Sequence, residues 1–166
     1  MFQLKKANLS DCLLIKNIAE ISFREAYKTI LSPEQLEYMF HMMYDEENII
    51  KQQTEEGHEY FLVYKGEEPC AYISIEKESD DMFHFQKVYA LPDIQGAGVG
   101  RYMIEQGIAY IKTSHPLPFS VQLNVNRANP ALGFYEHIGF KKVAERNHPI
   151  GNGFFMNDYI MQIDVE

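Results

Sequence analysis

The most informative part of the sequence is Val88-Tyr89-Ala90-Leu91-Pro92-Asp93-Ile94-Gln95-Gly96-Ala97-Gly98-Val99-Gly100-Arg101, where three closely spaced glycines join a β-rich segment to a helical one. Glycine permits positive φ and lets a ligand approach the backbone closely. The N-terminus of the following helix offers unpaired N–H groups and a partial positive charge. This stretch therefore predicts an anion site suited to a phosphate or pyrophosphate.

The glycine pattern does not fit two common phosphate motifs. No Gly-Lys-Ser/Thr follows, so the loop is not a P-loop. The dinucleotide fingerprint Gly-x-Gly-x-x-Gly is incomplete, because Arg101 or Met103 stands where its third glycine belongs. On the residues alone, a tight strand-to-helix turn without a ligand and a general nucleotide cradle both stay open.

The patterns on either side of the loop predict a mixed α/β domain over residues 1–166, with element order βαααβββαβαββ. Ser10-Asp11 and Ser32-Pro33 have the residue types that cap and open helices, and Gly57 and Gly139 are suited to ending them. The predicted strands are 2–6, 60–64, 71–75, 83–91, 119–126, 140–146 and 154–163. The predicted helices begin near residues 11, 33, 46, 99 and 130.

Composition excludes several classes of protein. The 166 residues carry a formal charge of −9, which argues against a broad nucleic-acid footprint. Two isolated cysteines predict a reduced, cytoplasmic chain, no stretch is long and apolar enough to span a membrane, and the histidines show no metal-binding spacing. The acidity is uneven: residues 1–80 carry 16 acidic and 8 basic side chains, whereas residues 81–166 carry 8 and 7.

Two motifs closely resemble signatures of the GNAT superfamily of N-acetyltransferases. Gln95, Gly98 and Gly100 fall on the acetyl-CoA signature Gln/Arg-x-x-Gly-x-Gly/Ala. The stretch from Asn129 to Phe140 resembles the second signature, Asn-x-x-Ala-x-x-x-Tyr-x-x-x-Gly-Phe. The resemblance implies an acetyl-CoA-dependent enzyme. It also implies a mostly antiparallel mixed sheet, splayed between its fourth and fifth strands and covered by helices on both faces.

The resemblance also implies how the cofactor is held. The loop amides would bind the CoA pyrophosphate, and a bulged strand before the loop would pair with the pantetheine arm through Val88 and Ala90. Asn129 would contact that arm, although it also suits a plain helix cap. The implied cofactor-binding residues are Val88, Ala90, Gln95, Gly96, Ala97, Gly98, Val99, Gly100, Arg101, Asn129 and Tyr135.

Two residues are candidates for the chemistry of acetyl transfer. Tyr135 matches the tyrosine that faces the thioester sulfur, where a phenol can protonate the departing thiolate; its alternative role is that of a core aromatic. His84 stands eleven residues before Gln95, where some members carry a glutamate base, and imidazole can act as a base at neutral pH. A structural strand histidine is an equal alternative. Gln86 could orient a water, and Glu76 and Glu78 are further candidate bases.

The acceptor amine is less well defined by the sequence. The stretch from Phe23 to Met39 loosely resembles the bacterial branch that acetylates spermidine and spermine, so a small cationic amine is expected. A peptide or protein N-terminus, or a non-catalytic acyl-CoA sensor, are the alternatives, and a homodimer is expected only by analogy. The pocket candidates are Phe23, Tyr27, Leu31, Tyr38, Phe40, Phe155 and Tyr159, with the acids Glu25, Glu34, Glu37, Asp45, Glu46, Glu47 and Asp158.

Overall fold

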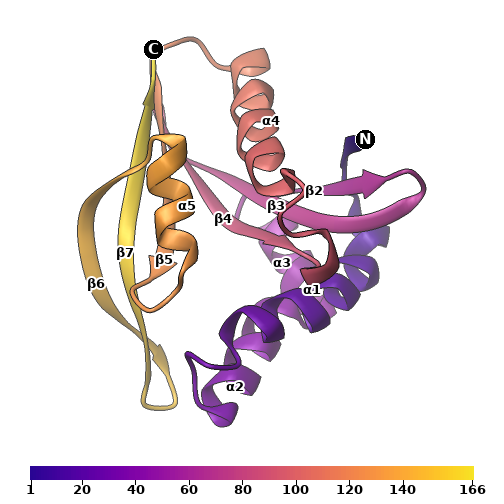
Figure 1. Ribbon diagram of the computed structural model, residues 1–166, viewed down its shortest axis with the longest axis vertical. Helices are drawn as coiled ribbons and strands as arrows, with labels where there is room; N and C mark the ends of the chain where they lie inside the picture. The colour runs from indigo at the N-terminus through magenta and orange to yellow at the C-terminus, as the bar shows by residue number, and fades with distance from the viewer.

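A seven-stranded sheet with the order β1-β2-β3-β4-β5-β7-β6 forms the centre of the computed structural model, which describes residues 1–166 (Figure 1). Every neighbouring pair is antiparallel except β4 and β5, which are parallel. The predicted mixed, mostly antiparallel sheet is therefore confirmed. Its strands are β1 (Phe2–Lys6), β2 (His58–Lys65), β3 (Glu68–Ser79), β4 (Met82–Ala90), β5 (Phe119–Asn126), β6 (Lys141–Gly151) and β7 (Phe154–Val165).

Helices cover both faces of the sheet, because its inner strands alternate apolar side chains between two cores. On β2, Phe61 and Val63 belong to the core under α4 and α5, whereas Tyr60 and Leu62 belong to the core under α1–α3. None of the helices is both long and apolar enough to cross a membrane. Their bounds are α1 (Cys12–Tyr27), α2 (Pro33–Tyr44), α3 (Glu46–Thr54), α4 (Val99–Ser114) and α5 (Ala131–Ile138).

The helix ends follow the predicted capping chemistry at Ser32 and Gly139, whereas α3 ends at Thr54, before the expected Gly57, and the first cap is shifted. Ser32 caps α2, since its hydroxyl accepts from the N–H of Gln35 at 3.1 Å and Pro33 is the first helical residue. The cap expected at Ser10-Asp11 lies instead at Asn8, which starts the 3-10 turn η1 (Leu9–Asp11) before α1. Asn8 accepts from the N–H of Ser10 while Asp11 accepts from the N–H of Asn8, a reciprocal box that the order of the residues did not reveal.

The parallel strands β4 and β5 pair over only three residues each, from Met82–Ser120 to His84–Gln122, and then diverge (Figure 1). This confirms the splay expected between the fourth and fifth strands. Leu91 donates to the carbonyl of Cys70 beyond the Ala71–Ala90 pair, so Ala90 sits at a non-hydrogen-bonded position of the β3–β4 ladder. Val88, two residues earlier, has the same parity. The backbone N–H and C=O groups of both residues therefore point away from β3, into the gap.

The register of β3 against β4 shifts at Gln86, which has no partner on β3 between the Ile75–Phe85 and Ser74–Lys87 pairs. This one-residue bulge is the irregularity that the family resemblance implied. Before it, Phe85 faces the α4 core, and after it Val88 faces the same core. The opposite face consequently carries polar side chains on both sides of the bulge, His84 before it and Lys87 after it.

Candidate active site

The glycine loop forms a concentrated set of unused N–H donors at the start of α4. Gly96 and Gly98 have φ values of +86° and +85°, a region that glycine enters at little cost. The N–H groups of Gln95 and Ala97 donate to Pro92 and Ile94, within and just after the 3-10 turn η2 (Pro92–Ile94), so these two predicted donors are not free. The backbone N–H groups without a protein acceptor are those of Gly96, Gly98, Val99, Gly100 and Arg101.

This loop fits an anionic group such as the pyrophosphate of CoA. A Cβ at Gly96 or Gly98 would meet no atom within 4 Å, so the space above both glycines is open. Gly100 serves packing instead, because a Cβ there would lie 2.8 Å from the ring of Phe134 on α5. The side chain of Gln95 connects the loop back to β4 by donating to the carbonyl of Ala90 at 3.2 Å. Together with the helix N-terminus, the free N–H groups have the chemistry that an anion requires.

Tyr135 is buried on α5 beside the loop, with its ring packed against Phe134 and Phe140 at centroid distances of 5.3 and 5.9 Å. Its hydroxyl makes no hydrogen bond to the protein, so it is available to a ligand even though the ring belongs to the core. Burial, with a smaller contribution from Tyr27, raises the pKa of Tyr135. The phenol therefore stays protonated at neutral pH and can serve as a proton donor.

Asn129 caps the start of helix α5, which is the alternative role expected from the sequence. Its Oδ1 accepts from the N–H of Ala131 at 2.9 Å and so fixes the start of α5. Tyr135, Gly139 and Phe140 reproduce the spacing of the second GNAT signature, but Asn129 stands six residues before Tyr135 where the signature has seven. Its contact with the cofactor arm stays a prediction.

A cleft of about 660 Å³ lies on the α1–α3 side of the sheet, where β4 leaves β5. It brings together residues from nine helices and strands that lie between Phe23 and Asp158 in the sequence. Four methionines give it an adaptable apolar wall, and acidic and basic groups lie among them. The cleft is lined by Phe23, Tyr27, Met39, Met42, Met43, Asn48, Lys51, Gln52, Glu56, His58, Glu76, Glu78, His84, Gln86, Lys87, Tyr89, Asn124, Arg146, His148, Ile150, Met156 and Asp158.

His84 reaches this cleft from β4, as expected of a base, and only 6% of it is exposed. Its Nδ1 lies 3.2 Å from Oε1 of Glu78, and its Nε2 is buried without a partner. Burial lowers the pKa of His84, and the negative charge of Glu78 opposes that shift. The imidazole is thus neutral near pH 7 and has a lone pair available.

The other polar groups predicted near His84 form a second pair. Gln86 donates to Oε1 of Glu76 at 2.8 Å, and Nε2 of His58 lies 3.4 Å from the same oxygen. Burial raises the pKa of Glu76, and it lowers the pKa of His58 to about 4. Glu76 is therefore held in place by Gln86 and lies in the cleft beside His84.

Lys87 is a cleft residue that the sequence did not reveal. It is 4% exposed, its ammonium donates to Oε1 of Gln52 at 2.7 Å and to the hydroxyl of Tyr60, and it lies 4.7 Å from the centre of the Tyr44 ring. Burial lowers its pKa to about 7. No sequence motif marks this residue, because its position depends on the bulge at Gln86.

Near Tyr135 the cleft is lined by two tyrosine hydroxyls and by an ion pair whose carboxylate is buried. The hydroxyls of Tyr27 and Tyr89 are 3.2 Å apart. Asp158 on β7, 4% exposed, accepts from Nη2 of Arg146 at 3.2 Å. Burial raises the pKa of Asp158 and the charge of Arg146 opposes the shift.

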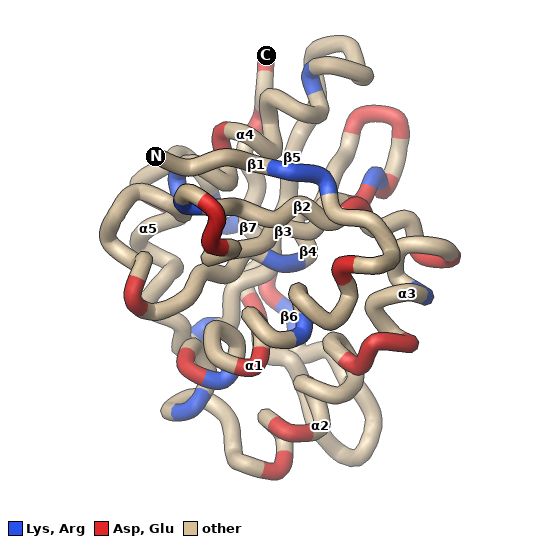
Figure 2. Tube along the Cα trace, turned by 90° about the vertical axis from the view of Figure 1, so that its right-hand side faces the viewer, with Lys and Arg blue, Asp and Glu red and all other residues tan.

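Most of the acids predicted to border the acceptor lie elsewhere. Of that set only Asp158 lines the cleft, and of the predicted apolar residues only Phe23 and Tyr27 do. Helical acids form ion pairs outside it, such as Glu37 with Arg24 and Asp45 with Lys16. Figure 2 shows acidic positions spread over the helices α1, α2 and α3. The acids that line the cleft besides Asp158 are Glu56, Glu76 and Glu78.

The tip of the β6–β7 hairpin bridges one side of the cleft. Tyr38 of α2 donates to the carbonyl of Ile150 at 2.7 Å, and Gln35 donates to the carbonyl of Phe155 at 2.7 Å. Gly151, with φ of +94°, lets the tip approach Tyr38 closely. Ile150 and the hairpin residue Met156 line the cleft next to this contact.

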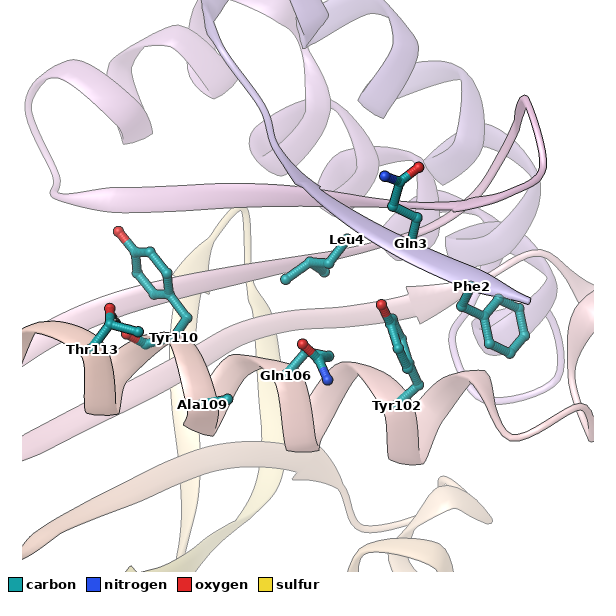
Figure 3. Close-up of a pocket in the computed structure, with 8 residues that line it drawn as sticks. All are labelled: Phe2, Gln3, Leu4, Tyr102, Gln106, Ala109, Tyr110 and Thr113. Carbon is teal, nitrogen blue, oxygen red and sulfur yellow. Dashed lines mark hydrogen bonds between the residues drawn. The ribbon is translucent and has the colours of Figure 1, made fainter.

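A second, shallower hollow lies between the edge strand β1 and helix α4, away from the predicted site residues (Figure 3). Tyr102 and Tyr110 rise from α4 toward β1, where Tyr102 packs on Phe2 and Tyr110 donates to Glu59. The hollow contains no charged side chain, so we assign it no chemistry. Its lining is Phe2, Gln3, Leu4, Tyr102, Gln106, Ala109, Tyr110 and Thr113.

Comparison with known proteins identifies the family. A family model described as "Acetyltransferase (GNAT) domain" matches residues 27–162. The chain belongs to the GNAT acetyltransferase family. This GNAT protein is 28% identical over 98 residues to the peptidyl-lysine N-acetyltransferase YjaB of Escherichia coli K12, a match that covers 57% of each chain. The chain thus spans little more than half the length of this curated relative.

Solved structures share the fold. PaiA N-acetyltransferase from Thermoplasma acidophilum, in complex with coenzyme A, has a TM-score of 0.79 at 18% identity, covering 98% of both chains. Mutant forms of the spermidine/spermine N-acetyltransferase SpeG from Vibrio cholerae have a TM-score of 0.68 at 20% identity, covering 99% of this chain and 95% of that one. At these identities the likeness concerns the fold, which agrees with the GNAT architecture inferred from the motifs.

Proposed function

We propose that this GNAT protein transfers an acetyl group from acetyl-CoA to the primary amine of a small cationic acceptor, with polyamines as the substrate class. The proposal rests on one observation: a cofactor-binding side and a cleft adjoin each other at β4. The open edge of the strand and the donor-rich loop lie on the cofactor side, while His84 faces the cleft. Tyr135, whose hydroxyl is unpartnered, stands beside this junction.

The loop and the strand edge are suited to hold the donor. Free N–H groups of Gly96, Gly98 and the first turn of α4 would bind the pyrophosphate. The unpaired backbone of Val88, with the N–H of Ala90, would pair with the pantetheine amides. When bound, acetyl-CoA supplies the thioester as an activated acyl group.

The residues around the junction divide the proton transfers between them. His84 would accept a proton from the attacking amine through Nε2, since its imidazole is neutral near pH 7. Tyr135 would donate a proton to the departing sulfur, because its raised pKa keeps the phenol protonated. Such general acid and base groups each contribute typically ~10²–10⁴-fold to rate.

The cleft supports a small cation more than a peptide. Carboxylates from strands β3 and β7 and from the loop after α3 line it, and Phe23, Tyr27 and Tyr89 supply aromatic faces suited to an alkylammonium. The bridge between the β6–β7 tip and α2 limits the room for a long chain on that side. The names of PaiA and SpeG agree with an amine acceptor, whereas YjaB acts on peptidyl lysine, so a protein lysine is the alternative.

The test is thiol release from acetyl-CoA, followed with a thiol reagent while spermidine, spermine, simple diamines and a lysine peptide are added in turn. We expect polyamines to give the highest kcat/KM. A preference for the lysine peptide would overturn the acceptor class. Coenzyme A binding without thiol release for any amine would overturn the enzymatic function and favour an acyl-CoA sensor.

A further inference from the structure

Two buried polar atoms that belong to cleft residues have no hydrogen-bond partner, Nε2 of His84 and Oδ1 of Asn124. The third such atom in the protein, Oγ of Ser22, belongs to a residue outside the cleft lining. Buried polar groups are nearly always paired, so each exception calls for an explanation. Two exceptions in one cavity point to a ligand group that pairs with both.

The two side chains come from adjacent strands at the point where the sheet opens. His84 on β4 stands opposite Gln122 in the last parallel pair, and Asn124 is two residues further along β5, on the same face as Gln122. Ordinary strand spacings would put the Cα atoms of His84 and Asn124 about 8 Å apart, and the divergence of the strands widens this, but both side chains line the same cleft. Both side chains can therefore reach one small group lying between them.

Both unpartnered atoms act as acceptors. A carboxylate only accepts, so the contact between Nδ1 of His84 and Glu78 places the imidazole proton on Nδ1 and the lone pair on Nε2. The amide oxygen of Asn124 also accepts. A pair of acceptors requires a group with at least two hydrogen-bond donors, which a water molecule and a primary amine have and a tertiary amine lacks.

We infer that Asn124 and His84 together receive the primary amino group of the acceptor, with Glu78 as the positioning residue that fixes the imidazole tautomer. The inference rests on the proposed function and adds a specificity-determining residue on β5. Asn124 holds one N–H of the amine while the nitrogen forms its bond to the acetyl carbon and the C–S bond breaks. A second amine proton passes to Nε2 of His84, and the sulfur takes the proton of Tyr135.

The test measures binding of pentylamine to the CoA-loaded protein by calorimetry, with N,N-dimethylpentylamine as the comparison. We expect pentylamine to bind at least tenfold more tightly than its dimethyl analogue. Asn124→Leu, of similar size without the acceptor oxygen, should weaken pentylamine binding roughly tenfold, which corresponds to about one buried hydrogen bond. Asn124→Asp keeps the acceptor oxygen and should retain binding.

The matched control is Gln122→Leu, on the same strand and face. Gln122 donates to Gln162 at 2.9 Å and does not line the cleft, so pentylamine binding should be unchanged. CoA affinity should be unchanged in every variant, which shows that the fold is retained.

Three results would overturn the inference: no binding of pentylamine, equal binding of the two amines, or unchanged binding in Asn124→Leu. Because binding is measured without turnover, a protein that binds pentylamine through Asn124 but transfers no acetyl group would count against the proposed function alone. An active enzyme whose amine binding does not depend on Asn124 would count against this inference alone.

Discussion

The buried amine of Lys87 should make the free energy of unfolding depend on pH. Replacement of Lys87 should abolish this dependence. Burial lowers the pKa of Lys87 from 10.5 to about 7. Between these values the unfolded chain binds a proton that the folded chain does not. The free energy of unfolding must therefore rise with pH across this window.

The magnitude follows from the linkage relation. One full proton of difference corresponds to 1.36 kcal/mol per pH unit. From pH 7 to 8.5 this gives about 1.6 kcal/mol, once the proton that the folded state still half-binds near pH 7 is subtracted. The window stops at 8.5 because above it the buried thiols of Cys12 and Cys70, whose pKa values burial raises, contribute with the opposite sign.

The assay is urea unfolding at pH 7.0, 7.75 and 8.5 for the wild type and for Lys87→Met, which keeps the chain length without the charge. Lys51→Met is the control, since Lys51 is exposed on α3 and should leave the wild-type slope intact. We expect the slope to vanish in Lys87→Met alone. A wild type whose stability is flat over this range, or a slope that persists in Lys87→Met, would refute the reasoning.

Three further predictions concern the site. Tyr135→Phe should lower kcat about 100-fold or more while CoA affinity, measured by calorimetry, stays within twofold; an unchanged kcat would exclude its acid role. Gly98→Ala, at φ of +85°, costs about 1–2 kcal/mol in the loop and should weaken CoA binding several-fold, whereas Gly133→Ala, without a positive φ, should not. Because the charge of Glu78 raises the pKa of His84, Glu78→Gln should move the acid limb of the kcat/KM profile to lower pH; a stationary limb would show that His84 is not the base.

The cofactor side of the site was largely predictable from sequence, because its geometry is local. Positive φ at Gly96 and Gly98 and the free first turn of α4 follow from the loop residues themselves. The N–H groups of Gln95 and Ala97, however, form hydrogen bonds within the loop. These bonds depend on the 3-10 turn before the loop, which has no distinct sequence signal.

The acceptor side was less predictable, because it is assembled from elements far apart in the chain. The acids on α1 and α2 could not be assigned to a face, and the structure pairs Glu37 with Arg24 outside the cleft. In the sequence, Asn124 is one of the polar residues of a strand that alternates polar and apolar side chains. Only the divergence of β5 from β4 makes it a cleft residue. Asn124 is distinguished from other polar strand residues by a side-chain oxygen that is buried and has no partner, rather than by its residue type.

The bulge at Gln86 also determines which kinds of mutation β4 can tolerate. Substitution of this half-buried residue changes one side chain, but its removal would invert the orientation of every side chain on one side of it. Lys87 would then turn into the apolar core, and Val88 would turn into the cleft. We therefore expect homologous chains to vary in residue type here far more readily than in length, and a one-residue deletion to abolish folding rather than merely reduce activity.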